Sequence, residues 1–150
     1  MTFLNHKAVE YIQMLISQPL CCGIKSERTE LYVFRFGCVA NAPNLHGESV
    51  TSIYNLHILC GFKIIRKIGK KSIKEYSSNS LPSIFKNDIN HLIGLTVKRV
   101  KLSDKNDLWI DFGDYWMVFV TNEDGEESWR FFSSCENSPH LVASDKWVRF

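Results

Sequence analysis

Residues 92–132, LIGLTVKRVKLSDKNDLWIDFGDYWMVFVTNEDGEESWRFF, carry the clearest structural pattern in the chain. Apolar residues alternate with polar ones in short runs, which is typical of strands with one buried face. Gly113-Asp114 and Asp124-Gly125 separate these runs and are strong hairpin signals. Because connections this short favour antiparallel neighbours, the stretch predicts a meander of four strands, the last over residues 128–132.

The sequence on either side predicts one helix and further strands. Residues 4–17 place apolar side chains at helical spacing, so we expect a helix that covers one face of a sheet. Residues 31–39 alternate strongly and predict a central strand, with Tyr32, Phe34, Phe36 and Cys38 on one face. Residues 52–60 and 62–68 predict two strands, or one strand bent at Gly61. Residues 141–150 supply one or two edge strands.

Two segments break these patterns, namely a loop over residues 41–49 and a turn-rich region over residues 75–90. A turn is also expected at Gly69-Lys70. Neither side of the turn-rich region is long enough for a separate domain, so we predict a single domain over residues 1–150. Its fold class is α+β, with a mainly antiparallel sheet or partly closed barrel and the N-terminal helix packed on it.

Composition excludes several classes of protein. The chain is 45% hydrophobic and 23% charged with a formal net charge of +2, as expected for an ordinary soluble protein. It contains no apolar run of the roughly 18 residues that a membrane span requires. The five cysteines are odd in number and loosely spaced, which argues against a disulfide framework. Free thiols persist in reducing compartments, so we expect a cytoplasmic protein.

No pattern of chemically reactive residues supports catalysis. His57 and Cys60 are three residues apart on a predicted strand, so their side chains point to opposite faces and do not form a metal site. The remaining cysteines and histidines match no nucleophile motif, and no glycine-rich phosphate loop is present. We therefore predict that the protein is not an enzyme and binds no metal or cofactor.

Charge is divided sharply along the chain. Residues 63–101 contain ten Lys and Arg but only two acids, whereas residues 104–127 contain eight acids and one Lys. Solvated strands and turns account for both segments most simply, because Asp is favoured in turns. The functional alternatives are an acidic rim that attracts a basic protein and a basic segment that contacts phosphate. The basic segment 63–74 lacks the interleaved aromatic residues of single-strand binders, so nucleic acid is the weaker alternative.

Several segments resemble a family of small bacterial proteins associated with polymorphic toxin systems. The resemblance is carried by YNLHILCGFKIIR at residues 54–66, and by ESWRFF and PHLV at residues 127–132 and 139–142. GLTVKRV and LWIDFGDYWMVFV precede ESWRFF, and together the segments cover about half of the chain. At Gly61-Phe62 this chain departs from the resemblance, which leads us to expect a Pro-Trp pair at these two positions. The resemblance implies an immunity protein, such as those of contact-dependent growth inhibition, and supplies no catalytic residues.

The leading hypothesis is thus an immunity protein that binds a cognate toxin domain, such as a nuclease, and covers its active site or substrate surface. The expected partner-binding residues are five acids in turns and two tryptophans as possible anchors: Asp104, Asp107, Asp114, Glu123, Asp124, Trp109 and Trp116. We expect at least one of the two tryptophans to lie in the core instead. The alternative is a nucleic-acid-binding module that uses segments 63–74 and 98–101.

Overall fold

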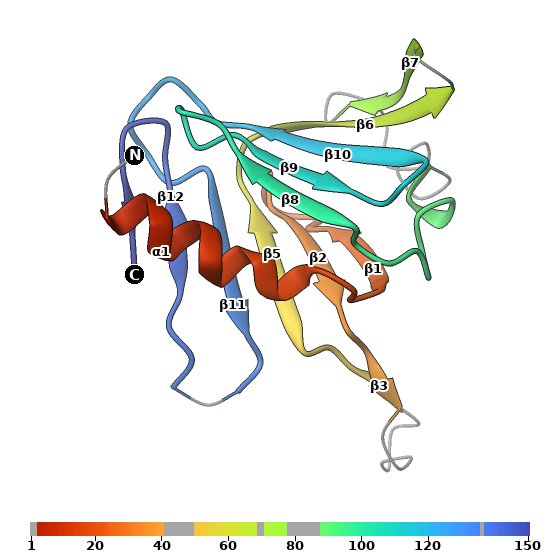
Figure 1. The fold of residues 1–150 in the computed structure, drawn as a ribbon, viewed down its shortest axis with the longest axis horizontal. Coiled ribbons are helices and arrows are strands. Elements are labelled where there is room, and N and C mark those ends of the chain that lie inside the picture. Colours follow the sequence, from red (N-terminus) through yellow and green to blue (C-terminus); the bar gives the residue numbers. More distant parts are fainter. Residues whose placement is uncertain (1–2, 41–49, 69–70, 78–87, 136) are drawn as a thin grey trace.

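The computed structural model describes residues 3–40, 50–68, 71–77, 88–135 and 137–150. It is a mainly antiparallel β structure with a short N-terminal helix, as predicted, but the two main sheets do not close into a barrel (Figure 1). Helix α1 spans Phe3–Ile12 and continues into a 3-10 turn, η1, at Gln13–Leu15. None of the described helices is long and apolar enough to cross a bilayer.

One sheet has six strands in the order β1-β2-β5-β11-β12-β13. All the strand pairs in it are antiparallel. Its strands are β1 Leu20–Lys25, β2 Tyr32–Phe36, β5 Tyr54–Ile58, β11 Trp129–Ser133, β12 Leu141–Ala143 and β13 Val148–Arg149.

The second sheet has five strands in the order β7-β6-β10-β9-β8, again all antiparallel. Its strands are β6 Gly61–Ile68, β7 Lys71–Ser77, β8 Arg99–Leu102, β9 Leu108–Asp111 and β10 Tyr115–Val120. A separate small pair joins β3 Val39–Ala40 to β4 Val50–Thr51.

Aromatic side chains fill the space between the two large sheets. The Phe62 ring of β6 lies 4.7 Å from the Tyr32 ring and 5.6 Å from the Phe34 ring, both on β2. Phe34 also lies 5.6 Å from Phe119 of β10. Trp129 is completely buried, and its indole N–H donates to the backbone oxygen of Asn106 at 2.9 Å. The inward faces of the sheets therefore form one apolar core.

The helix lies across an open side of this sandwich (Figure 1). It contacts β13 of one sheet and β8 of the other, and its inner surface buries Ala8 and Ile12, followed by Leu15 in η1. The helix packs on the β structure as predicted, but it contacts the edge strands of both sheets and does not cover the face of one sheet. The α-helix also ends at Ile12 rather than residue 17.

The predicted four-strand meander is wrong in its last step. Strands β8, β9 and β10 are consecutive neighbours as expected, and Gly113 in the β9–β10 turn has a φ of 98°. After β10, however, the chain crosses to the other sheet, where β11 lies between β5 and β12. Strand β10 has β6 as its second neighbour, because the longer β6 pairs with it over six residues from Gly61 to Arg66.

The other strand predictions hold with adjustments. Strands β2, β5 and β6 form as expected, and the chain changes sheets at Gly61. Strand β1, with its sequence LCCGIK, and the lysine-rich β7 were not predicted, because neither alternates clearly. The predicted loop 41–49, the Gly69-Lys70 turn and most of the region 75–90 lie outside the described residues.

The expectation of five free thiols is also wrong. Cys21 of β1 and Cys38, which follows β2, form a disulfide with Cα atoms 5.9 Å apart. Cys22, Cys60 and Cys135 are free. Two cysteines 17 residues apart become neighbours because β1 and β2 form an antiparallel hairpin. The argument from free thiols to a cytoplasmic location is thereby removed.

Candidate functional site

The outer face of the five-stranded sheet brings the two predicted anchor tryptophans together. Strand register places Arg99 opposite Asp111 and Asp111 opposite Trp116 in one cross-strand row. The neighbouring row places Lys101 opposite Trp109, Trp109 opposite Val118 and Val118 opposite Lys63. We call this surface the tryptophan face and define it by its eight residues: Lys63, Lys67, Arg99, Lys101, Trp109, Asp111, Trp116 and Val118.

Trp109 and Trp116 are both half-buried and lie edge to face, with ring centroids 5.7 Å apart. Neither belongs to the core, so the expectation that at least one would be a core residue is wrong. The fully buried tryptophan is Trp129, on the other sheet. The reason is strand parity: Leu108 and Ile110 point inward from β9, and this directs Trp109 outward.

A buried carboxylate organises the cations on this face. Asp111 is only 3% exposed, and its carboxylate accepts from Lys67 Nζ at 2.6 Å and from Arg99 Nε at 3.0 Å. The same two cations lie over the Trp116 ring, with Lys67 Nζ 4.2 Å and the Arg99 guanidinium 5.3 Å from its centroid. Such contacts hold a cation against the face of an aromatic ring.

Asp111 remains ionised despite its burial. Desolvation by burial raises its pKa, but hydrogen bonds from Lys67, the Gly113 backbone N–H and Arg99 outweigh this effect, so the pKa of Asp111 is lowered. The tryptophan face thus combines two indole rings, four cations and one carboxylate, and Lys63, Arg99 and Lys101 are exposed. Its chemistry suits the recognition of a partner that offers apolar and negatively charged groups.

The predicted acids separate into two locations. Asp104 and Asp107 lie in the β8–β9 turn, which meets residues 121–124 after β10. Asp114 lies in the β9–β10 turn at the opposite end of the sheet. We call the first group, Asp104, Asp107, Glu123 and Asp124, the acidic rim.

The members of the acidic rim have different roles. The half-buried Asp107 carboxylate accepts from the Thr121 backbone N–H at 2.8 Å and from its hydroxyl at 2.9 Å, so Asp107 joins two connections. Asp104, Glu123 and Asp124 are exposed, and Glu123 lies 3.9 Å from Lys105. Asp124 accepts from the Glu126 backbone N–H within its own turn. Three acids of the rim are therefore accessible to a partner.

A second polar cluster lies on the outer face of the six-stranded sheet, and it was not predicted. The His140 ring stacks on Phe132 with centroids 4.3 Å apart, and the His57 and Phe132 rings form a T-shaped pair with centroids 4.9 Å apart. Arg130 forms two hydrogen bonds with Glu127, at 2.8 and 3.0 Å, and approaches His140 at 3.2 Å. Strands β5 and β11 and the residues that directly precede β11 and β12 assemble this cluster, and they belong to three of the segments that carry the family resemblance.

Burial shifts the pKa of two residues, His57 and Cys60, that the sequence raised as candidates for a metal site. Burial lowers the pKa of His57, assisted by Arg130 and Arg35, so its imidazole is neutral at pH 7. Burial raises the pKa of Cys60 to about 12, so this thiol is not a nucleophile at neutral pH. Among the residues that the structure describes, no three His, Cys, Asp or Glu side chains form a group able to hold a metal ion.

Comparisons with known proteins leave the family assignment open. Neither a protein-family model, nor a curated protein, nor a solved structure matches this chain.

Proposed function

We propose that this chain is a binding protein of the immunity type, which neutralises a cognate bacterial toxin domain by covering its active site or substrate surface. The observation that supports this best is the Trp109–Trp116 pair on the outer face of a sheet, half-buried and 5.7 Å apart. Tryptophans held in this way are strong candidates for interface anchors, because they present a large apolar area at low entropic cost.

Charge divides the proposed interface into two parts. The exposed acids Asp104, Glu123 and Asp124 lie at the end of the sheet where β9 begins, and Trp109 is the second residue of β9. The acids would attract the basic part of a partner, such as a phosphate-binding nuclease site, and Trp109 would anchor the partner beside the rim. The exposed cations of the tryptophan face would contact negatively charged groups elsewhere on the same partner. Asp114 lies at the other end of the sheet, so we place it outside this interface. We further propose that the protein acts in the cytoplasm of the producing cell.

Charge reversal at the rim tests this proposal. The double variant Asp104→Lys/Glu123→Lys should lose protection of cells that express the cognate toxin domain, because the rim would then repel a basic partner. Glu30→Lys is the matched control, since Glu30 is an exposed acid outside the rim. Circular dichroism establishes that each variant is folded. Full protection by the folded double variant would show that the rim is not the interface.

Truncation of the anchor gives a second measurement. Trp109→Ala should weaken toxin binding by about tenfold or more, the effect of losing a residue that contributes at least about 1.4 kcal/mol to binding. Titration calorimetry with the purified toxin domain measures this change. Unaltered affinity would exclude Trp109 as an anchor, and the absence of any binding by the wild type would refute the immunity proposal.

The tryptophan face also favours a second candidate, the binding of single-stranded nucleic acid. In the sequence, the basic segment 63–74 lacks interleaved aromatic residues. In the fold, Lys63 and Lys67 lie on the same face as Arg99 and Lys101, with both tryptophans between them. Cations that follow a backbone and rings on which bases stack are the components of such sites.

Salt dependence separates the two candidates. If the four cations contact phosphates, log affinity for a fluorescent oligonucleotide should fall against log salt with a slope of about −3. Lys63→Gln/Lys101→Gln should reduce this slope by about half, and Lys25→Gln, on the other sheet, should leave it unchanged. The absence of binding at low salt would exclude the nucleic-acid candidate and leave the immunity proposal unaffected.

A further inference from the structure

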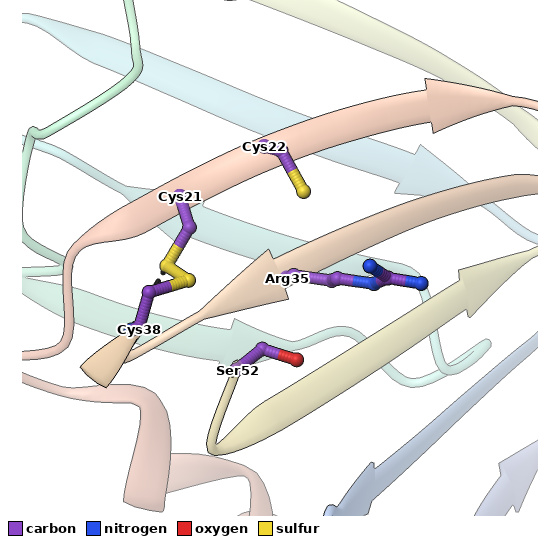
Figure 2. A pocket seen from close by; sticks show the side chains of 5 residues that line it. All are labelled: Cys21, Cys22, Arg35, Cys38 and Ser52. Carbon is purple, nitrogen blue, oxygen red and sulfur yellow. Dashed lines mark hydrogen bonds between the residues drawn. A yellow bond between two sulfur atoms is a disulfide. The ribbon is translucent and has the colours of Figure 1, made fainter. Parts of the chain in front are cut away.

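The disulfide borders a pocket that also contains a thiol and a guanidinium group. The pocket has a volume of about 270 Å³ and is lined by Cys21, Cys22, Arg35, Cys38 and Ser52. Figure 2 shows these side chains arriving from β1, from β2, and from the segments that follow β2 and precede β5. Both disulfide cysteines are half-buried, so a small molecule in the pocket would lie beside the S–S bond.

Arg35 provides a cation for a ligand in this pocket. It is exposed, and it lies opposite Cys22 in the β1–β2 pairing. Lys67, Arg99, Lys105 and Arg130 form ion pairs within the described ranges, whereas no described carboxylate lies at ion-pair distance from Arg35. A guanidinium group without a carboxylate partner is well suited to bind the carboxylate of an incoming molecule.

The neighbouring Cys22 thiol does not attack the disulfide itself under ordinary conditions. Burial raises the pKa of Cys22, and the opposing effect of Arg35 is smaller. The thiol therefore stays protonated at neutral pH, and only a thiolate is an effective nucleophile in disulfide exchange. An external thiolate is needed to open the Cys21–Cys38 bond.

We propose that this pocket is a thiol-exchange site for a small thiol that carries a carboxylate, with Arg35 holding the carboxylate while the sulfur reacts with the Cys21–Cys38 disulfide. The thiolate attacks one sulfur of the pair, a new S–S bond forms as the old one breaks, and the released cysteine takes up a proton. A second thiolate displaces the protein sulfur from the mixed disulfide. The protein then holds two thiols, and the small thiol leaves as its own disulfide.

The test compares two small thiols that differ in charge, 3-mercaptopropionate and 2-mercaptoethanol. Each is added to the oxidised protein, the reaction is stopped by alkylation, and mass spectrometry follows the opening of the Cys21–Cys38 bond. The ratio of the two rates is compared between variants, which cancels the intrinsic reactivity of each thiol. The ratio is the rate with 3-mercaptopropionate divided by the rate with 2-mercaptoethanol. Arg35→Gln should lower this ratio by about threefold, the size expected for a partly exposed ion pair.

Two controls keep the result interpretable. Arg28→Gln removes an exposed cation in the turn between β1 and β2 and should leave the ratio unchanged, whereas Arg35→Lys should largely retain it. If Arg35→Gln does not fold, added salt tests the wild type, whose ratio should fall as the ion pair is screened. A ratio independent of both Arg35 and salt would overturn the proposal, as would a bond that opens only after denaturation.

Discussion

At the scale of single residues, Asp111 is the most constrained polar group described on the tryptophan face. Its carboxylate is almost buried, yet it accepts hydrogen bonds from Lys67, Arg99 and the Gly113 backbone N–H. Burying a carboxylate lowers the stability of the fold unless hydrogen bonds and nearby cations compensate for its lost hydration. The same interactions hold two cations over Trp116, so one acid positions much of this surface.

Replacing this acid should destabilise the fold. Asp111→Asn removes the charge that both cations contact, and we expect the free energy of unfolding to fall by about 1–3 kcal/mol, since breaking buried charge-assisted hydrogen bonds has effects of this order. Urea titration measures the change. Asp114→Asn, an exposed acid three residues away, is the control and should be nearly neutral. Equal stability of the two variants would contradict the proposed role of Asp111.

The pH dependence of stability follows from the lowered pKa of Asp111. A carboxylate whose pKa is lower in the folded state stabilises the fold above its unfolded pKa, about 3.9 for Asp. That contribution is lost as the pH falls from about 4 through the folded pKa. Urea midpoints between pH 7 and pH 2 should therefore decline less steeply in Asp111→Asn than in the wild type. Parallel declines would show that other carboxylates account for the acid sensitivity.

At the scale of elements, the turns that carry the acids differ in what they do. The β8–β9 turn is tied to the segment after β10 by Asp107, because its carboxylate holds both the N–H and the hydroxyl of Thr121. Thr121 is 7% exposed, so water does not readily replace that partner. The sequence predicted equivalent roles for the acids in these turns, whereas the structure distinguishes a joining acid from the exposed ones.

This difference is measurable. Asp107→Ala leaves the buried Thr121 N–H without its acceptor, whereas the Thr121 hydroxyl keeps the Lys105 backbone oxygen at 3.0 Å. The free energy of unfolding should fall by about 1–3 kcal/mol. Asp104→Ala, in the same turn but exposed, should change it by no more than about 0.5 kcal/mol. Thermal unfolding of the two variants provides the comparison. A neutral Asp107→Ala would mean that the contact with Thr121 contributes nothing to stability.

At the scale of the whole molecule, the two large sheets share a core through a few aromatic side chains. Phe62 is 2% exposed and belongs to the five-stranded sheet, but its ring contacts Tyr32 and Phe34 of the six-stranded sheet. The contacts are edge-on, an arrangement that aromatic pairs favour. We therefore expect the two sheets to unfold together.

Truncation of this ring tests the coupling. Phe62→Ala should lower the free energy of unfolding by about 3–5 kcal/mol, because it leaves a cavity between the sheets. Ile24→Ala, at a position that is 47% exposed, is the apolar control and should have little effect. Near-ultraviolet and far-ultraviolet circular dichroism should give coincident transitions. Separate transitions would show that the sheets are independently stable.

Much of the fold was predictable from local pattern. Alternation identified β2, β5, β6, β9 and β10, and helical spacing identified the N-terminal helix. Each of these elements buries one face, so its apolar residues recur at the period of a strand or a helix. β1 and β7 were missed because Cys21-Cys22-Gly23 and the lysines of β7 carry no such period. Trp109 and Trp116 were predicted as partner-binding residues, but the expectation that at least one of them would lie in the core was wrong.

The sequence by itself determined most of the segments that become strands, where the sharp turns lie and which segments carry opposite charge. Tertiary structure alone decided which strands became neighbours. It sent β11 to the other sheet, placed Lys67 and Arg99 on either side of Asp111 and Trp116, and joined Cys21 to Cys38. The physical reason is that alternation records only which face of a strand is buried. The partner across each strand edge depends on how distant segments pack around a shared core.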